Sequence, residues 1–437
     1  MRSFLILSLK EIKDTFFSKT ALLFLVLVSL IIGYGFFSAV GLYSEQSMAA
    51  VNNLLYARGF EPVPGVFGPT YGGLFVLFSL FLPFVIIQLV SLEKGQNTFS
   101  ILTQLPFSFK DILTAKIIAS FLFLLFVLML SLPCIILWRL YGGHIPLNEL
   151  VLLISGYLLY GMFVVSVSFF SASLFDSTAN ASIFSIFLII SSWVIDFGSN
   201  MNMSQALSSI SAWTVTKVLK YFENGILSFT AVMYFVLVCS TFFVLTYILL
   251  RFDLKGKWRS ISSTVILSLL AMFILSHIAL NIDVTESHRN SFPANISRAL
   301  KKVPNLEIDI YMEKGDSRFK DYQRSFLKKL SLVKNDVKVK MMTGDEHKKS
   351  YGLFVYKVNG KSEKTYSNSE QEIFPIIFGL AGISVGHGSE KTNFPGYPLV
   401  VKGKLSVIRY TYYLLIPFGM ILAFVAKEIK LRRRFKK

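Results

Sequence analysis

Long apolar runs alternate with short polar connections along most of this chain. A helix that crosses a bilayer needs about 20 apolar residues, and such runs lie at 20–42, 71–92, 117–140, 151–174, 182–197, 226–250, 261–282 and 406–426. Only 16% of the residues are charged and 53% are hydrophobic, whereas a soluble domain is about 25% charged. The pattern predicts an α-helical polytopic membrane protein with about eight transmembrane helices.

Residues 1–19 are too polar to span a membrane, but their apolar positions are periodic. Leu5, Leu9, Ile12 and Phe16 recur at helical spacing on one face, which predicts an amphipathic helix lying on the inner membrane surface. A cleaved signal peptide is the alternative. We disfavour it because the charged lead is long, the apolar run that follows has the length of a span, and no clear cleavage site closes that run.

The segment 283–405 changes to a period-two pattern. Apolar and polar residues alternate at 306–311 and 337–341, an amphipathic helix is predicted at 316–333, and Asn359-Gly360 joins two further alternating runs as a hairpin turn. The apolar stretch 373–385 is too short and glycine-rich to span, so we expect it to be the last helix here. The series predicts a small α/β domain between the last two spans.

Positive charge is distributed unequally between alternate connections. The net charge is +18, and eighteen of the Lys and Arg residues lie in 1–19, 93–116, 251–259 and 427–437. The connections 42–70, 141–150 and 198–225 hold only Arg58, Lys217 and Lys220. By the positive-inside rule, both termini are expected in the cytoplasm and the α/β domain outside it. The same distribution argues against nucleic-acid binding.

No motif of a catalytic or metal site stands out. The histidines show no ligand spacing, and Gly386–Thr392, which superficially resembles a phosphate-binding loop, has Glu390 where that motif requires glycine. We therefore expect no catalytic residue, no metal ligand and no cofactor in this chain. Ionisable residues within spans are functional candidates, and here they are Asp196 and His277, near the outer ends of their spans. Their scarcity disfavours an ion-coupled transporter.

The segment from Ser91 to Lys116 is the most informative connection. A charged exit from the second span leads to a short amphipathic helix, a break at Pro106 and a helix that re-enters the membrane. Exposed apolar side chains on such a rigid element suit docking of a partner. From these residues alone, an ordinary interfacial loop is an equally good interpretation.

This segment resembles the coupling loop of ABC-2 type exporter permeases (GldF-like), which contacts the ATPase subunit. The matching positions are Glu93, Gly95, Thr98, Leu102, Leu105, Pro106 and Lys116. Gln96-Asn97 separates the glycine from the threonine, which are usually adjacent in that family. The resemblance extends over the N-terminal helix and six spans, through about residue 250.

A second resemblance covers the remainder of the chain. Asp283-Val-Thr-Glu286 after an apolar span, Pro398-Leu-Val-Val-Lys-Gly403 and the basic tail after the last span are similar to the gliding-motility auxiliary proteins (GldG-like). The middle of that family's large domain is missing here. The chain therefore resembles a permease fused to a shortened auxiliary module.

The two resemblances imply a domain plan. It comprises an interfacial helix at 1–19, a six-span permease core at 20–250, a linker and seventh span at 251–282, an extracytoplasmic α/β domain at 283–405, and an eighth span and basic tail at 406–437. They also imply the membrane subunit of an ATP-binding-cassette exporter in a bacterial cytoplasmic membrane.

The same resemblances imply partners. A separate cytoplasmic ATPase would bind ATP and Mg²⁺, a second permease copy would complete the pore, and an envelope protein would bind the outer domain. Two alternatives remain open: an ATP-driven machine that passes motion to an envelope partner without transport, and a membrane scaffold with no ATPase.

Overall fold

The computed structural model describes residues 2–51, 53–57, 59–95, 108–200, 210–211, 213–251, 256–278, 280–313, 316–334, 336–342, 350–383, 394–401, 403 and 405–435. These residues form two compact units. Unit 1 comprises Met1–Leu280 and Gly396–Lys437, and unit 2 comprises Asn281–Pro395.

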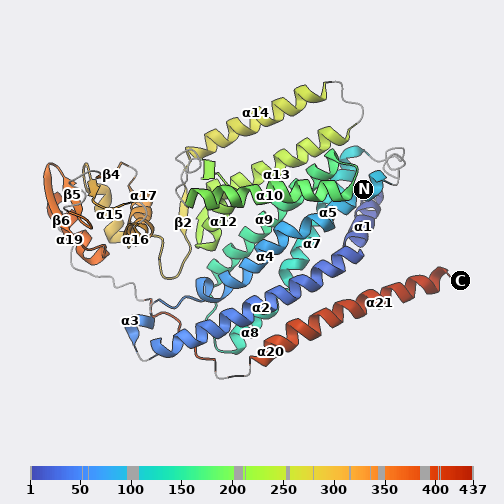
Figure 1. The fold of residues 1–437 in the computed structure, drawn as a ribbon, viewed down its shortest axis with the longest axis horizontal. Helices are drawn as coiled ribbons and strands as arrows, with labels where there is room; N and C mark the ends of the chain where they lie inside the picture. The colour runs from blue at the N-terminus through green and yellow to red at the C-terminus, as the bar shows by residue number, and fades with distance from the viewer. Residues whose placement is uncertain are drawn as a thin grey trace. The chain divides into compact units, whose positions relative to one another are not determined.

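Unit 1 is a bundle of long helices with short elements at its ends (Figure 1). Its elements are α1 (Arg2–Phe16), α2 (Lys19–Ala50), α3 (Leu54–Ala57), the π-helical turn η1 (Val63–Phe67), α4 (Gly68–Leu80), α5 (Leu82–Gly95), α7 (Phe109–Met129), α8 (Leu132–Leu140), α9 (Leu147–Leu174), α10 (Thr178–Asn200), α12 (Val215–Glu223), β1 (Ile226–Ser228), α13 (Phe229–Leu250), α14 (Lys257–Ser276), α20 (Ser406–Arg409), η3 (Tyr410–Leu415) and α21 (Ile416–Phe435).

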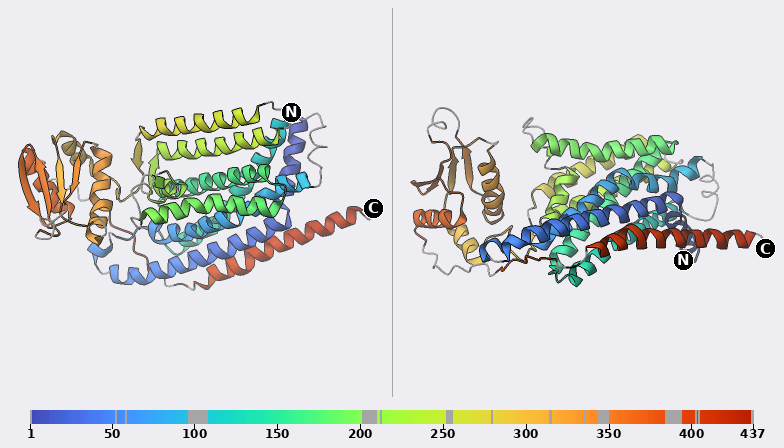
Figure 2. Two further views of the ribbon diagram at one scale, coloured as in Figure 1. Left: turned by 45° about the horizontal axis from the view of Figure 1, so that its top comes forward. Right: turned by 60° about the horizontal axis from the view of Figure 1, so that its bottom comes forward.

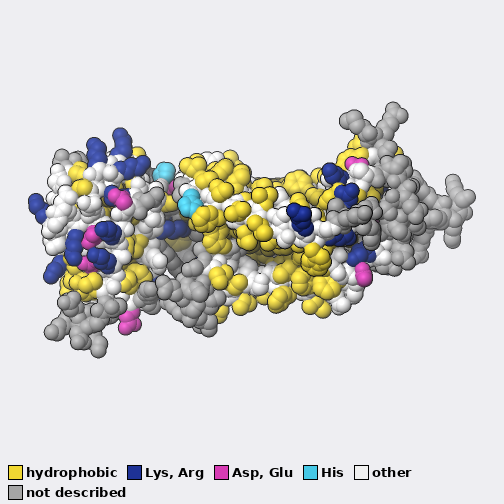
Figure 3. All heavy atoms as spheres, turned by 90° about the horizontal axis from the view of Figure 1, so that it is seen from above, with side chains coloured by type: hydrophobic (Ala, Val, Ile, Leu, Met, Phe, Trp, Pro, Cys, Tyr) yellow, Lys and Arg dark blue, Asp and Glu magenta, His cyan; other side chains and the backbone are white. Residues whose placement is uncertain are grey.

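Eight helices in the described residues are long and apolar enough to cross a membrane, so the predicted class of helical membrane protein is confirmed at that level. They cover Lys19–Ala50, Val63–Ser91, Phe109–Leu140, Leu147–Leu174, Thr178–Gly198, Phe229–Leu250, Lys257–Ser276 and Ser406–Ile429. Hydrophobic side chains cover much of the face seen in Figure 3, as expected for a surface in contact with lipid. Both chain termini lie at one end of the bundle, here called the termini end (Figures 1 and 2).

The last span packs along the first one (Figure 2). Tyr412 of η3 is fully buried there: its carbonyl oxygen accepts a hydrogen bond of 2.8 Å from the Ser29 hydroxyl, and its own hydroxyl donates to the carbonyl oxygen of Leu130 at 2.9 Å. A Cβ atom added to Gly33 would lie 2.3 Å from Cβ of Tyr412. Glycine at position 33 is therefore required for this close approach of the two helices.

The segment before the last span lies beside α2 at the end of the bundle opposite the termini. The backbone N–H groups of Leu399 and Val401 donate to the hydroxyls of Ser47 and Ser44, at 3.0 and 2.9 Å. The Tyr43 hydroxyl donates to the carbonyl oxygen of Tyr397 at 2.7 Å. We call residues 397–401 the strap. Its bonds fix the chain to α2 just before the chain enters the last span.

Unit 2 contains a four-stranded sheet with the order β4-β3-β5-β6. Strands β3 and β4 are parallel, whereas β3–β5 and β5–β6 are antiparallel. The elements of this unit are β2 (Asn281–Asp283), α15 (Ala294–Lys302), β3 (Glu307–Ile310), α16 (Ser317–Tyr322), η2 (Gln323–Leu327), α17 (Lys328–Val333), β4 (Lys338–Met341), β5 (Phe354–Val358), β6 (Lys361–Thr365) and α19 (Glu370–Ala381).

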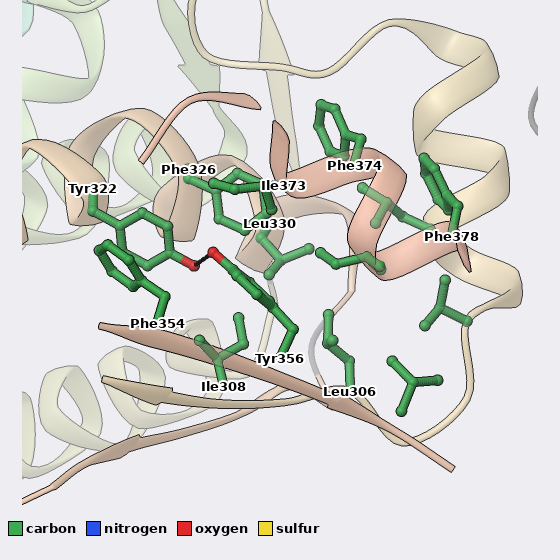
Figure 4. Close-up of a cluster of buried hydrophobic side chains, with 14 of the residues drawn as sticks. Leu306, Ile308, Tyr322, Phe326, Leu330, Phe354, Tyr356, Ile373, Phe374 and Phe378 are labelled. Carbon is green, nitrogen blue, oxygen red and sulfur yellow. Dashed lines mark hydrogen bonds between the residues drawn. The ribbon is translucent and has the colours of Figure 1, made fainter. Parts of the chain in front are cut away.

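One face of this sheet carries the core of unit 2 (Figure 4). Ile308, Phe354 and Tyr356 point from the strands toward Phe326 and Phe374 on the helices, as period-two alternation predicts. At the β5–β6 hairpin, Asn359 and Gly360 have φ angles of 50° and 80°, values typical of the turn that Asn-Gly favours.

Substitution of Gly33 tests the packing of the last span. We expect Gly33→Ala to destabilise the full chain by about 1–3 kcal/mol, because the added methyl overlaps Tyr412 in a filled interface. The measurement is thermal unfolding in detergent. Gly41→Ala is the matched control, because a Cβ at Gly41 of α2 meets no atom within 4 Å. Equal melting temperatures for the two variants would contradict the packing described.

Candidate functional site

A buried ion cluster joins three helices at the termini end of unit 1. The Lys116 ammonium of α7 lies 2.8 Å from Oε2 of Glu11 on α1 and 2.9 Å from Oε2 of Glu93 on α5. It also donates to the carbonyl oxygen of Leu89 at 2.8 Å. The side chains of Lys116 and Glu11 are each 2% exposed, and that of Glu93 is 15% exposed.

The positive and negative charges of the cluster balance. The Lys116 ammonium donates hydrogen bonds to Glu11 and to the carbonyl oxygen of Leu89, and its contact with Glu93 is an ion pair. Lys10 lies 3.1 Å from both Glu11 and Glu93, so two ammonium groups face two carboxylates. Burial opposes the charge of Lys10, but the two carboxylates outweigh it and raise the pKa of this lysine above its usual value. We refer to Lys10, Glu11, Glu93 and Lys116 as the ion cluster.

Local sequence signals place these side chains. Ser108 and Asp111 form a capping box, with Ser108 N–H donating to Asp111 at 3.1 Å and Asp111 N–H donating to the Ser108 hydroxyl at 3.2 Å, which starts α7 immediately after the connection. Lys116 follows two turns later. On α1, Leu7 packs with Ile112 of α7 in a small apolar core beside the cluster.

Lys94, which follows Glu93 in α5, contacts the end of a fourth helix, α9. The Lys94 ammonium donates to the carbonyl oxygens of Ala172, Ser173 and Phe175 at 3.3–3.4 Å and pairs with Asp176 at 3.0 Å. These carbonyl groups belong to the end of α9, where a cation is favoured by the unpaired backbone oxygens. Glu93 and Lys94 therefore fix the end of α5 to α1, α7 and α9 together.

The structure brings together two of the predicted coupling residues, Glu93 and Lys116. Gly95 is the last residue of α5. Thr98, Leu102, Leu105 and Pro106 lie outside the described residues, between α5 and α7.

Sequence reasoning missed Glu11, the central acid of the cluster. The predicted apolar face of α1 includes Leu5 and Leu9, which are 59% and 63% exposed, whereas Glu11 and Thr15 are buried. A signal for Glu11 was present in the sequence, because Lys116 directly precedes an apolar run and a lysine there needs a carboxylate partner. The partner's identity depends on tertiary packing, which periodicity does not provide.

Asp196 and His277 do not form a common site. Asp196 of α10 accepts a hydrogen bond of 2.7 Å from Lys220 of α12 and lines a cavity of about 550 Å³ between α4, α9, α10 and α12. His277 follows α14, and its Nδ1 lies 2.9 Å from the carbonyl oxygen of Phe273 in the same helix. Only Asp196 is therefore placed where a ligand could reach it in company with other polar groups.

In unit 2, Asp283 of the Asp-Val-Thr-Glu motif organises its own turn. Its carboxylate accepts hydrogen bonds from the Thr285 and Ser291 hydroxyls at 2.7 and 2.8 Å and from the Asn290 N–H at 3.0 Å. Partial burial opposes ionisation, but the hydrogen bonds from Thr285, Ser291 and Asn290 outweigh it and lower the pKa of this carboxyl. These contacts give the motif a structural role in starting unit 2.

Comparison of the chain with models of known protein families finds no match, and comparisons with curated proteins and with solved structures find none either.

Removal of the central ammonium tests the ion cluster. We expect Lys116→Met to destabilise the protein by about 3–5 kcal/mol, because Glu11 and Glu93 would lose their buried partner and keep only the partly exposed Lys10. The measurement is thermal unfolding of the purified full chain. Lys110→Met, an exposed change on the same helix, should leave stability nearly unchanged.

Combining Lys116→Met with Glu11→Gln and Glu93→Gln removes all three buried charges and should recover part of the lost stability. A triple variant less stable than Lys116→Met alone would show that the carboxylates do not depend on this lysine.

The lowered pKa of Asp283 predicts that the stability of unit 2 depends on pH. Its pKa is lower when folded than its unfolded value of about 3.9, so its carboxylate stabilises unit 2 above that value and loses this effect as the pH falls through the folded pKa. Asp283→Asn should therefore increase cleavage of unit 2 by protease at pH 7. The difference between Asp283→Asn and wild type should shrink below about pH 4.

The exposed Asp321→Asn is the control for this pH series. A difference in stability between Asp283→Asn and wild type that is equal at pH 7 and pH 3 would contradict the assignment.

Proposed function

We propose that this chain is the transmembrane permease subunit of an ATP-binding-cassette exporter of the ABC-2 type, driven by a separate cytoplasmic ATPase. The observation that carries the proposal is the ion cluster. It joins α1 to α5 and α7, the two helices that carry the ends of the segment 93–116, which resembles a coupling loop.

Coupling to an ATPase requires a rigid connection between its docking site and the spans. An ATPase can shift a permease between two states only if it contacts those states differently, and its push must reach the spans rather than bend a loop. Glu11, Glu93 and Lys116 supply a buried link from α1 to two spans, and Lys94 extends it to α9. A force applied near residues 96–107 would thus act on several spans together.

The proposal implies partner proteins and an orientation in the membrane. ATP and Mg²⁺ would bind the ATPase partner, and a second permease copy would complete a pathway through the bilayer. Both termini would face the cytoplasm of a bacterium, and unit 2 would lie outside the cytoplasmic membrane, where it could meet an envelope partner.

The second candidate is an ATP-driven machine that passes motion to that envelope partner without transport. The strap favours it, because Leu399 and Val401 bond to Ser47 and Ser44 of α2. Movement of α2 would therefore displace the chain segment that leads back from unit 2. A continuous polar pathway between the spans would favour export over this machine.

Purification of the tagged chain from its native membrane in a mild detergent tests the ATPase assignment. We expect a nucleotide-binding subunit in stoichiometric amount. Leu105→Asp combined with Pro106→Ala should reduce its recovery about tenfold, equivalent to about 1.4 kcal/mol of binding, because the predicted contact is apolar.

A matched control lies at the other end of the bundle. Pro146→Ala with Leu147→Asp changes a similar pair at the start of α9, where Leu147 is 66% exposed, and should retain the subunit. Complete absence of an ATPase from the wild-type preparation would contradict the proposal and favour a membrane scaffold.

A further inference from the structure

The cavity beside Asp196 has the size and lining of a ligand site. Its volume of about 550 Å³ falls within the range of roughly 300–1,000 Å³ that small-molecule sites occupy. Aromatic side chains supply much of its wall: Phe75, Tyr157, Trp193 and Phe197. Phe75 and Trp193 stack with ring centroids 4.8 Å apart, so the apolar wall is ordered by contacts between its own members.

The polar groups of the cavity gather on one side. Lys220 and Glu223 belong to α12, and Asp196 is bonded to Lys220. Glu223 accepts a hydrogen bond of 2.8 Å from the Tyr157 hydroxyl. The side formed by α4 contributes Gly72 and Phe75 instead. A cavity with one charged side and one apolar side suits an amphiphilic molecule.

Packing of α12 creates this arrangement. Val215, Val218, Leu219 and Phe222 recur at helical spacing and are buried, which directs Lys220 and Glu223 along another face. A Cβ atom on Gly156 of α9 would lie 2.4 Å from Cβ of Phe222. Glycine at 156 thus lets α12 approach α9 closely enough to bring its charged residues to the cavity.

The charged side chains of the cavity determine which head group an amphiphilic ligand could carry there. Oδ1 of Asp196 accepts no hydrogen bond from the described residues, and the Lys217 ammonium forms a long ion pair with it at 4.0 Å. Lys220, the one ammonium of the described lining, already donates to the other oxygen of Asp196. The lining therefore includes the carboxylates of Asp196 and Glu223 together with aromatic faces, all of which attract a cation.

We propose that this cavity binds an amphiphile whose head group carries an ammonium group. The ammonium lies against Asp196 and the aromatic rings, and the apolar chain extends along Phe75 toward α4. Its role as exported cargo rests on the proposed function above. The binding itself does not, since it depends only on the cavity.

The test uses the full chain in lipid nanodiscs and a brominated alkyltrimethylammonium probe, whose bromine quenches the fluorescence of nearby tryptophan. We expect saturable quenching in wild type and its loss in Trp193→Phe, which removes the reporter. Asp196→Asn should raise the half-saturating concentration about tenfold, equivalent to about 1.4 kcal/mol. Saturable quenching that persists in Trp193→Phe would place the bound probe elsewhere and overturn the proposal.

A second variant avoids disturbing the ion pair. Gly72 lines the cavity and a Cβ there meets no atom within 4 Å, so Gly72→Leu should fill the cavity, keep the fold and abolish saturable quenching. Gly41→Leu, at a glycine with equally open surroundings outside the cavity, should bind the probe as wild type does. Unchanged binding by Gly72→Leu would overturn the proposal.

Head-group chemistry is tested with a brominated alkyl sulfate of the same chain length. Saturation by the sulfate at an equal or lower concentration than by the ammonium probe would also overturn the proposal. The probe-binding result and the ATPase result test different proposals. Probe binding without an accompanying ATPase would refute export alone, whereas an ATPase without probe binding would refute only the cavity's role.

Discussion

Burial of the Lys116 ammonium is the constraint on which the termini end of the bundle depends. An ammonium group that is 2% exposed at the start of a span carries a desolvation cost of several kcal/mol unless carboxylates lie against it. Glu93 comes from α5, but Glu11 comes from α1, which is not among the eight described helices long and apolar enough to cross a membrane. The need of the Lys116 ammonium for carboxylate partners thus fixes α1 in a defined position against α5 and α7.

The two ends of unit 1 use charge differently. At the termini end, Lys116 contacts the carboxylates of Glu11 and Glu93 and the carbonyl oxygen of Leu89, and Lys94 binds the last carbonyl groups of α9. Such an arrangement favours a single rigid geometry. Asp196 lines an aromatic cavity, and one of its carboxylate oxygens has no hydrogen bond from the described residues. The first arrangement suits transmission of force, and the second suits binding of a small molecule.

Much of the fold could be predicted because it follows from local pattern. Span-length apolar runs mark the eight long helices, and alternation with Asn359-Gly360 marks the β5–β6 hairpin. Asp196 could be identified as a candidate from its place in an apolar run. Its partner Lys220 could not be identified in this way, because the contact of α12 with α10, like its close approach to α9 at Gly156, depends on tertiary packing. Glu11 was missed for the same reason: its burial depends on α7, about 100 residues later.

The central claim is that the ion cluster holds α1 rigidly on α5 and α7. Hydrogen–deuterium exchange of the full chain in nanodiscs tests it most directly. The account predicts slow exchange of the α1 amides from Leu7 to Thr15 in wild type, at rates similar to the start of α7, and much faster exchange in Lys116→Met. Rapid exchange of α1 in wild type, or exchange unaffected by loss of Lys116, would contradict the account.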